Sequence, residues 1–132
     1  MILDTSFIID LMEADRDAVK KLRWLEAEEI PVKLVAVTAF ELFYGAERYV
    51  EPQEEKRQIE EAIGQIPVQK LPLSWNAGGR GGELKAGLEQ DGESTGTVDT
   101  LISATALEEE EPVLTANPSH FDRVSGLEVE TY

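Results

Sequence analysis

Residues 97–106, TVDTLISATA, decide the fold because they combine the apolar face of a helix with a carboxylate. On a helix, Asp99 lies in line with Ile102 and Ala106, at the i, i+3 and i+7 spacings that mark one face. That face should enter the core. Burial of an ionised carboxylate costs several kcal/mol unless the group is paired or binds a metal. We therefore expect a partner or a cation beside Asp99.

The segments around this helix alternate between strand and helix patterns. Apolar runs predict strands at residues 1–5, 31–38, 67–73, 112–117 and 127–132. Apolar stripes predict helices at residues 15–29, 38–50, 52–66 and 97–110, and another that begins near Ser6 as its N-cap. Strands separated by helices predict the α/β class, with a three-layer α/β/α sandwich around a mainly parallel sheet of four or five strands. Residues 1–132 are expected to form one domain.

Two segments depart from these patterns. Pro72 interrupts the strand predicted at 67–73, which favours an edge position in the sheet. The stretch GGRGG at 78–82 falls within a helical pattern, although each glycine costs about 1 kcal/mol there relative to alanine. We expect a poor helix or one that begins late. A flexible flank of a cleft and a phosphate-cradling loop are the alternatives for these glycines, although the spacing GxxxxGK[ST] is absent.

The composition is strongly acidic, with 27 acidic residues against 12 basic ones and a formal net charge of −15. This charge indicates a solvated surface suited to high ionic strength, and it argues against salt-sensitive binding of nucleic acids. Nucleic acid chemistry is still allowed at a site where cations neutralise the acids. The absence of cysteine excludes disulfides and thiolate metal sites, and a single His120 argues against imidazole metal sets and Ser-His-Asp triads.

The apolar runs are all short. None approaches the roughly 18 consecutive apolar residues of a membrane span, so we expect no contact with a membrane. Asp4 interrupts the apolar start and no basic region precedes it, so we expect no signal peptide. With the absence of cysteine, these features are consistent with the cytoplasm.

Polar side chains occur where the predicted strands end. Asp4 and Asn117 follow buried strands, and Glu41 lies one turn into the helix after the second strand. In open parallel sheets, ligands bind outside the carboxyl ends of the strands. If these acids converge with Asp99, their repulsion raises their pKa values and opposes folding unless a cation intervenes. Oxygen ligands without cysteine or histidine select Mg²⁺ or Mn²⁺, and such an ion promotes phosphodiester hydrolysis.

Each of these residues also has a purely structural interpretation. Asp4 fits the N-cap of the following helix, and Asp99 fits an acidic first turn that complements the helix dipole. Thr38 and Glu41, in the stretch TAFE, have the spacing of a capping box. Asn117 is typical of a turn. The residues by themselves leave these alternatives open.

Three blocks of the chain resemble the PIN-domain nucleases, and within them the VapC toxins of type II toxin–antitoxin systems. The blocks are MILDTSFIIDLM (1–12), VTAFELFYGAER (37–48) and residues 96–132. The resemblance implies a PIN-like fold. It also implies a Mg²⁺- or Mn²⁺-dependent endoribonuclease that cleaves single-stranded regions of RNA and leaves 5′-phosphate and 3′-hydroxyl ends.

The same resemblance implies roles for particular side chains. The metal ligands would be three carboxylates, namely Asp4, Glu41 and Asp99. Asn117 would occupy a fourth catalytic position, where relatives carry Asp or Asn, and its neutral side chain leaves open whether one or two ions bind. Hydroxyl groups would orient the carboxylates or the phosphate, and these belong to Thr5, Ser6 and Thr115.

Protein partners are also implied by the resemblance. A VapB-type antitoxin would occupy a groove and place a basic side chain among the acids, which suits their charge. A homodimer or a toxin–antitoxin hetero-oligomer is expected. Candidate groove residues, each with a core role as the alternative, are Phe43, Tyr44, Trp24 and Leu25. Candidate phosphate contacts, each with a surface role as the alternative, are Arg48, Arg57 and Arg80.

Two further functions stay open. A housekeeping PIN nuclease of RNA maturation would share the same chemistry, whereas a PIN-like binding module would have lost it. The neutral Asn117 favours the binding module. His120 lies where some relatives carry an additional Asp, and it is either a solvated side chain or a substrate contact.

Overall fold

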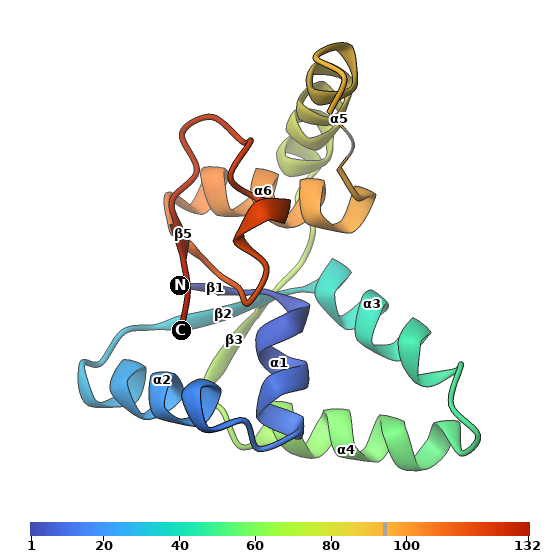
Figure 1. The fold of residues 1–132 in the computed structure, drawn as a ribbon, viewed down its shortest axis with the longest axis vertical. Helices are drawn as coiled ribbons and strands as arrows, with labels where there is room; N and C mark the ends of the chain where they lie inside the picture. Colours follow the sequence, from blue (N-terminus) through green and yellow to red (C-terminus); the bar gives the residue numbers. More distant parts are fainter. Residues whose placement is uncertain (94) are drawn as a thin grey trace.

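The strands form one five-stranded parallel sheet in the computed structural model, which describes residues 1–93 and 95–132 (Figure 1). The strands are β1 (Ile2–Leu3), β2 (Val32–Val35), β3 (Val68–Leu71), β4 (Val113–Leu114) and β5 (Val129–Glu130). Their order is β3-β2-β1-β4-β5, which places β3 at an edge as predicted. The chain moves outward from β1 through β2 to β3 and then returns to place β4 on the other side of β1. The switch point of the sheet therefore lies between β1 and β4, where open sheets bind ligands.

Helices cover both faces of this sheet (Figure 1). They are α1 (Thr5–Met12), α2 (Arg16–Ala27), α3 (Ala36–Ala46), α4 (Pro52–Gly64), α5 (Trp75–Gln90) and α6 (Thr97–Glu109), and a 3₁₀ turn, η1, spans Pro118–His120. In Figure 1, α1, α2 and α4 lie on one side of the strands, and α5 and α6 lie on the other. None of the helices in the described ranges is long and apolar enough to cross a membrane.

Two apolar cores lie on opposite sides of the sheet, because successive strand residues point to opposite faces. Leu3 and Leu114 belong to the first core, whose other buried members include Phe7, Leu25, Leu34, Leu42 and Ile59. Ile2 and Val113 belong to the second core, whose other buried members are Val35, Ile102, Ala106 and Phe121. The predicted three-layer α/β/α sandwich with a parallel sheet is confirmed.

Two helix starts differ from their predictions. Ser6 is not the N-cap of α1, because the helix begins at Thr5 and Asp4 occupies the cap position. Thr38 is not the N-cap of α3, because Val35, the last residue of β2, caps that helix directly. Both helices follow their strands without a loop, so each begins earlier than its hydroxyl residue. The predicted capping box of Thr38 and Glu41 is therefore wrong.

The prediction of a late-starting glycine-rich helix is also wrong, because α5 begins at Trp75. Ser74 is its N-cap, and its hydroxyl oxygen accepts a 3.0 Å hydrogen bond from the amide of Ala77. Gly81 faces α6 so closely that a Cβ atom there would lie 2.9 Å from Cδ2 of Leu101. Packing of α5 on α6 thus outweighs the poor helix propensity of glycine. The glycines at 78–82 are helical and do not form a phosphate-binding loop.

Candidate functional site

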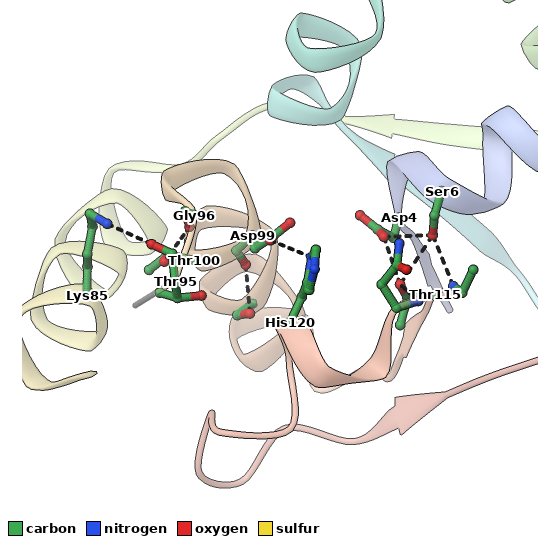
Figure 2. Close-up of polar contacts among 12 residues, drawn as sticks. Asp4, Ser6, Lys85, Thr95, Gly96, Asp99, Thr100, Thr115 and His120 are labelled. Atoms are coloured by element: carbon green, nitrogen blue, oxygen red, sulfur yellow. Dashed lines mark hydrogen bonds and ion pairs between the residues drawn. The ribbon is translucent and has the colours of Figure 1, made fainter. Parts of the chain in front are cut away.

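Asp4 lies at the switch point, directly after β1. Its amide donates a 3.0 Å hydrogen bond to the carbonyl of Leu114, so the ends of β1 and β4 are side by side. Its side chain is only 4% exposed. The carboxylate oxygen Oδ2 accepts hydrogen bonds from the hydroxyls of Ser6 at 2.9 Å and Thr115 at 2.8 Å. In Figure 2 the other carboxylate oxygen points away from Ser6, toward the side on which His120 lies.

The hydroxyls of Ser6 and Thr115 also fix the turn after β4. They lie 3.2 Å apart, Ser6 Oγ accepts a hydrogen bond from the amide of Ala116 at 3.0 Å, and Thr115 Oγ1 accepts one from the amide of Asn117 at 2.9 Å. This small network joins the start of α1 to the end of β4. Two of the three predicted orienting hydroxyls thus contact the Asp4 carboxylate directly.

The third predicted hydroxyl, that of Thr5, does not bond to Asp4. Its Oγ1 is buried and has no hydrogen-bond partner among residues 1–93 and 95–132, and the same holds for Oγ1 of Thr38 on α3. A buried hydroxyl without a partner loses its hydrogen bonds to water and is uncommon. Thr5 also lines the same groove as Glu41.

Asp99 comes to the site from the first turn of α6. Its side chain is 18% exposed, and its Oδ2 lies 3.1 Å from Nδ1 of His120 (Figure 2). Ile102 and Ala106, on the same helix face, are fully buried in the second core. The face on which Asp99 lies therefore enters the molecule, as predicted.

Three carboxylates act on one another here. Burial raises the pKa of Asp99, the negative charge of Asp4 raises it further, and the charge of Glu41 adds to this, while His120 opposes these effects. Asp4, Glu41 and Asp99 therefore lie in one electrostatic region. Within the described ranges, none of the three pairs with a lysine or an arginine.

The acids near the amino ends of the strands, unlike those near the carboxyl ends, form ion pairs. There, Lys33 of β2 contacts Glu109 at 3.0 Å and Glu111 at 2.5 Å, and the amino group of Met1 also pairs with Glu111. These contacts lower the pKa of Glu111 and raise the pKa of Lys33. Within the described part of the chain, the acids at the amino ends of the strands thus pair with cationic groups, whereas Asp4, Glu41 and Asp99 pair with no lysine or arginine.

Glu41 lines a groove of about 460 Å³ between α1, α3 and α4, together with Thr5. The apolar part of this groove is formed by side chains that include Ile9, Met12, Leu42, Tyr44, Tyr49 and Ile59. Several of them are open to solvent, and Ile9 and Tyr44 are 42% and 59% exposed. An apolar groove therefore borders Glu41, one of the three carboxylates.

The donor set fits a hard divalent ion. In the described part of the chain, no three Asp, Glu or His side chains form a ready-made cage. Mg²⁺ seldom uses such a cage, because it keeps several waters and binds through one or two carboxylates. Asp4 and Asp99 supply such carboxylates beside the switch point, and only oxygen and one imidazole nitrogen are at hand.

Asn117 and His120 lie in the turn that follows β4. Asn117 is exposed and precedes η1. Its backbone amide donates a hydrogen bond to the hydroxyl oxygen of Thr115. The sequence does not distinguish a solvated His120 from one that contacts substrate, because the contact of His120 with Asp99 joins two elements far apart in the chain. The only sequence signal for these two residues is that they are polar and follow the end of a central strand.

The residues predicted to line the antitoxin groove lie in different places in the structure. Tyr44 lines the groove, whereas Leu25 is 1% exposed within the first core and Phe43 packs against that core. Trp24 lies on α2, with the ammonium group of Lys21 4.3 Å from its ring centroid. The interpretation of Leu25 as a groove residue is wrong, because its helix face is buried under the sheet.

The three predicted phosphate contacts also lie in different settings. Arg48 lines the groove with Glu41, and Arg80 is exposed on α5. Arg57 is tied to Glu54 at 2.6 Å and to Glu61 at 2.7 Å on α4. These contacts raise the pKa of Arg57 and lower that of Glu54 to about 2. Arg48 is the one of the three that is near the carboxylates.

Comparison with known proteins gives consistent matches. The family described as PIN domain matches residues 1–127. The chain is 32% identical over 97 residues to a tRNA(fMet)-specific endonuclease VapC from Shigella flexneri, which covers 74% of this chain and 72% of the relative.

Solved structures with the same fold include toxin–antitoxin complexes. VapBC2 from Rickettsia felis, bound to a promoter DNA fragment, superposes with a TM-score of 0.88 at 22% identity, covering 99% of this chain and 97% of the other. DNA-bound VapBC from Salmonella typhimurium superposes with a TM-score of 0.83 at 25% identity, covering 98% and 96%.

Proposed function

Since the chain belongs to the PIN domain family and to its VapC members, we propose that it is an endoribonuclease acting as the toxin of a toxin–antitoxin pair. It hydrolyses phosphodiester bonds in single-stranded regions of RNA and depends on Mg²⁺ or Mn²⁺. We also propose that residues 1–132 form one PIN domain and that this domain acts in the cytoplasm.

The observation that carries this proposal is the electrostatic repulsion among the carboxylates of Asp4, Glu41 and Asp99. The pKa of Asp99 is raised by burial and by Asp4 and Glu41, and no lysine or arginine of the described ranges neutralises them. Such repulsion opposes folding, so it is retained where a bound cation compensates for it. We therefore assign the metal ligands to Asp4, Glu41 and Asp99.

A bound divalent ion would neutralise charge on the phosphate and lower the pKa of the attacking water. The residues of the chain position that ion and the substrate. Ser6 and Thr115 hold one oxygen of Asp4, which leaves the other oxygen free to bind the ion. The buried hydroxyl of Thr5 has no partner in the described residues. The exposed side chain of Asn117 offers a carbonyl oxygen to the ion or an N–H group to a phosphate oxygen.

The groove between α1, α3 and α4 supports an antitoxin as the partner. Its apolar side chains suit the buried face of a short helix, and Glu41 at one end suits a basic side chain. We propose that a VapB-type antitoxin occupies this groove and blocks the carboxylates. A homodimer of the chain, or a hetero-oligomer with the antitoxin, would be the resting form.

The proposal is tested by searching for a small open reading frame beside the gene and inducing the chain in cells with and without the protein that this frame encodes. Growth should stop without the antitoxin and recover with it, and sequencing of RNA 5′-phosphate ends should show new cuts in single-stranded loops. Because the Shigella flexneri relative is named for tRNA(fMet), the initiator tRNA is the first substrate to inspect.

The outcomes separate the competing functions. Cleavage without growth arrest, and no antitoxin gene nearby, would point to a housekeeping nuclease. Stable binding of RNA with no new ends, in Mg²⁺ and in Mn²⁺, would point to a binding module, which is the outcome that the neutral Asn117 favours. Either result would contradict the assignment as a toxin.

A further inference from the structure

His120 is the only histidine of the chain, and the fold holds it at the rim of the proposed metal site. It ends η1, the turn that follows β4 at the switch point. Its amide donates a 3.1 Å hydrogen bond to the carbonyl of Asn117. The next residue, Phe121, is fully buried in the second core and anchors the turn. The backbone of His120 is therefore fixed by packing, although its side chain is 54% exposed.

The imidazole ring contacts the carboxylate of Asp99. Its Nδ1 lies 3.1 Å from Oδ2 of Asp99, and in the view of Figure 2 the ring stands between the side chains of Asp99 and Asp4. Among residues 1–93 and 95–132, Nε2 makes no hydrogen bond within the protein. The ring thus has one partner, Asp99, and that partner is a proposed metal ligand.

We propose that His120 is itself a ligand of the divalent ion, bound through Nδ1 beside Asp99, and that it favours Mn²⁺ over Mg²⁺. This inference rests on the proposed metal site. Two ligand atoms that each lie about 2.1 Å from one ion, at a right angle, are separated by about 3.0 Å. The 3.1 Å between Nδ1 and Oδ2 is close to that separation, which fits two atoms that would bind the same ion.

The preference for Mn²⁺ follows from the type of donor. Mg²⁺ is bound by oxygen atoms and keeps its waters, whereas an imidazole nitrogen strengthens the binding of transition metals. A site that consisted of Asp4, Glu41 and Asp99 alone would offer oxygen atoms only. Addition of one imidazole nitrogen raises the affinity for Mn²⁺ more than the affinity for Mg²⁺ and leaves the carboxylates in place.

The test is pulsed electron paramagnetic resonance of Mn²⁺ bound to the full-length chain. Bound Mn²⁺ should show the coupling of a directly ligated imidazole nitrogen, and ¹⁵N-labelled histidine should change it to the ¹⁵N pattern. Because the chain has a single histidine, that change identifies His120 without ambiguity. The coupling should vanish in His120→Ala.

Metal affinities provide the second readout. His120→Ala should weaken Mn²⁺ binding by about tenfold or more and Mg²⁺ binding by about threefold or less, measured by calorimetric titration. Ser119→Ala, an exposed neighbour in the same turn, should change neither affinity. Because the side chain of His120 is half exposed, all variants should fold, and their melting temperatures without metal check this.

The results separate failure of the inference from failure of the metal site. If Mn²⁺ binds to the wild-type chain and requires Asp99, but shows no nitrogen coupling, His120 is not a ligand and the inference is overturned. If Mn²⁺ does not bind, or binds equally well to Asp99→Asn, the proposed metal site is overturned together with the inference.

Discussion

Thr115 donates a 2.8 Å hydrogen bond to the buried carboxylate of Asp4, although 111 positions separate the two residues in the chain. The bond joins the ends of β1 and β4 at the switch point of the sheet. It fixes the orientation of a side chain that we assign to the metal ion. The Thr115 hydroxyl therefore both stabilises the ends of β1 and β4 and orients the Asp4 carboxylate.

Thr115→Val should lower the stability of the protein. It keeps the shape of the side chain but removes one of the two donors to Oδ2 of Asp4, and a hydrogen bond to a charged group contributes about 1.5–3 kcal/mol. We expect the free energy of unfolding to fall by about 2 kcal/mol in urea titrations with EDTA. Thr131→Val, at an exposed position, is the matched control and should be neutral. Equal stability of both variants and the wild type would contradict the role of Thr115.

Asp99→Asn should stabilise the metal-free protein at neutral pH. The pKa of Asp99 is raised in the folded state from an ordinary value of 3.8, so the folded state holds this proton more tightly than the unfolded state does. Stability from this group is complete below about pH 4 and is lost as the pH rises through the raised pKa. At pH 7 the charged Asp99 therefore opposes folding.

We expect the melting temperature of Asp99→Asn at pH 7 to exceed that of the wild type by roughly 2–5 °C, or about 1 kcal/mol for a chain of this length. The difference should narrow as the pH falls toward 4. Asp122→Asn removes the same charge at an exposed position and is the control. A difference that does not change with pH would show that the charge of Asp99 is not its cause.

Salt should stabilise the fold. With a net charge of −15, the folded chain repels itself, and the screening length shrinks from about 30 Å at 0.01 M salt to about 3 Å at 1 M. The melting temperature should rise by several degrees over this range of KCl. The double variant Glu26→Lys, Glu28→Lys, at exposed positions of the α2 end, should show a weaker rise. A melting temperature indifferent to KCl would contradict the expectation.

The groove should be required for the antitoxin and not for the fold. Ile9 is 42% exposed and lines the groove, so Ile9→Glu places a charge where an apolar helix would pack. We expect the complex with the antitoxin to weaken by about 2 kcal/mol or more, as for the central residues of other interfaces. Val50→Glu, a fully exposed position outside the groove lining, is the control. Equal affinities of the two variants in calorimetric titrations would place the antitoxin elsewhere.

Much of the fold could be predicted because strands and helices alternate strongly along the chain. The parallel sheet, the edge position of β3 and the buried face of α6 were all predicted from local patterns. The starts of α1 and α3 were not, because each helix follows its strand directly and takes its cap from a strand-end residue. The close approach of Gly81 in α5 to Leu101 in α6 is a contact between distant segments, which no local pattern reveals.

The candidate site was predictable only in part. Strand ends suggested Asp4 and Asn117, and the mixed face of residues 97–106 suggested Asp99. The contacts of Thr115 with Asp4 and of His120 with Asp99 join distant segments, so only the folded structure shows them. The unpartnered hydroxyls of Thr5 and Thr38 are likewise properties of the packed interior.

The most direct test of the central claim is the cleavage rate of a tRNA substrate by the purified chain, its Asp4→Asn variant and its Asp99→Asn variant. Assays contain Mg²⁺, Mn²⁺ or EDTA. We predict that the wild type cuts with either ion and not with EDTA, and that each substitution lowers the rate roughly a thousandfold, as expected for the loss of several kcal/mol of metal-based stabilisation. Undiminished cleavage by both variants, or cleavage in EDTA, would contradict a metal ion held by these carboxylates.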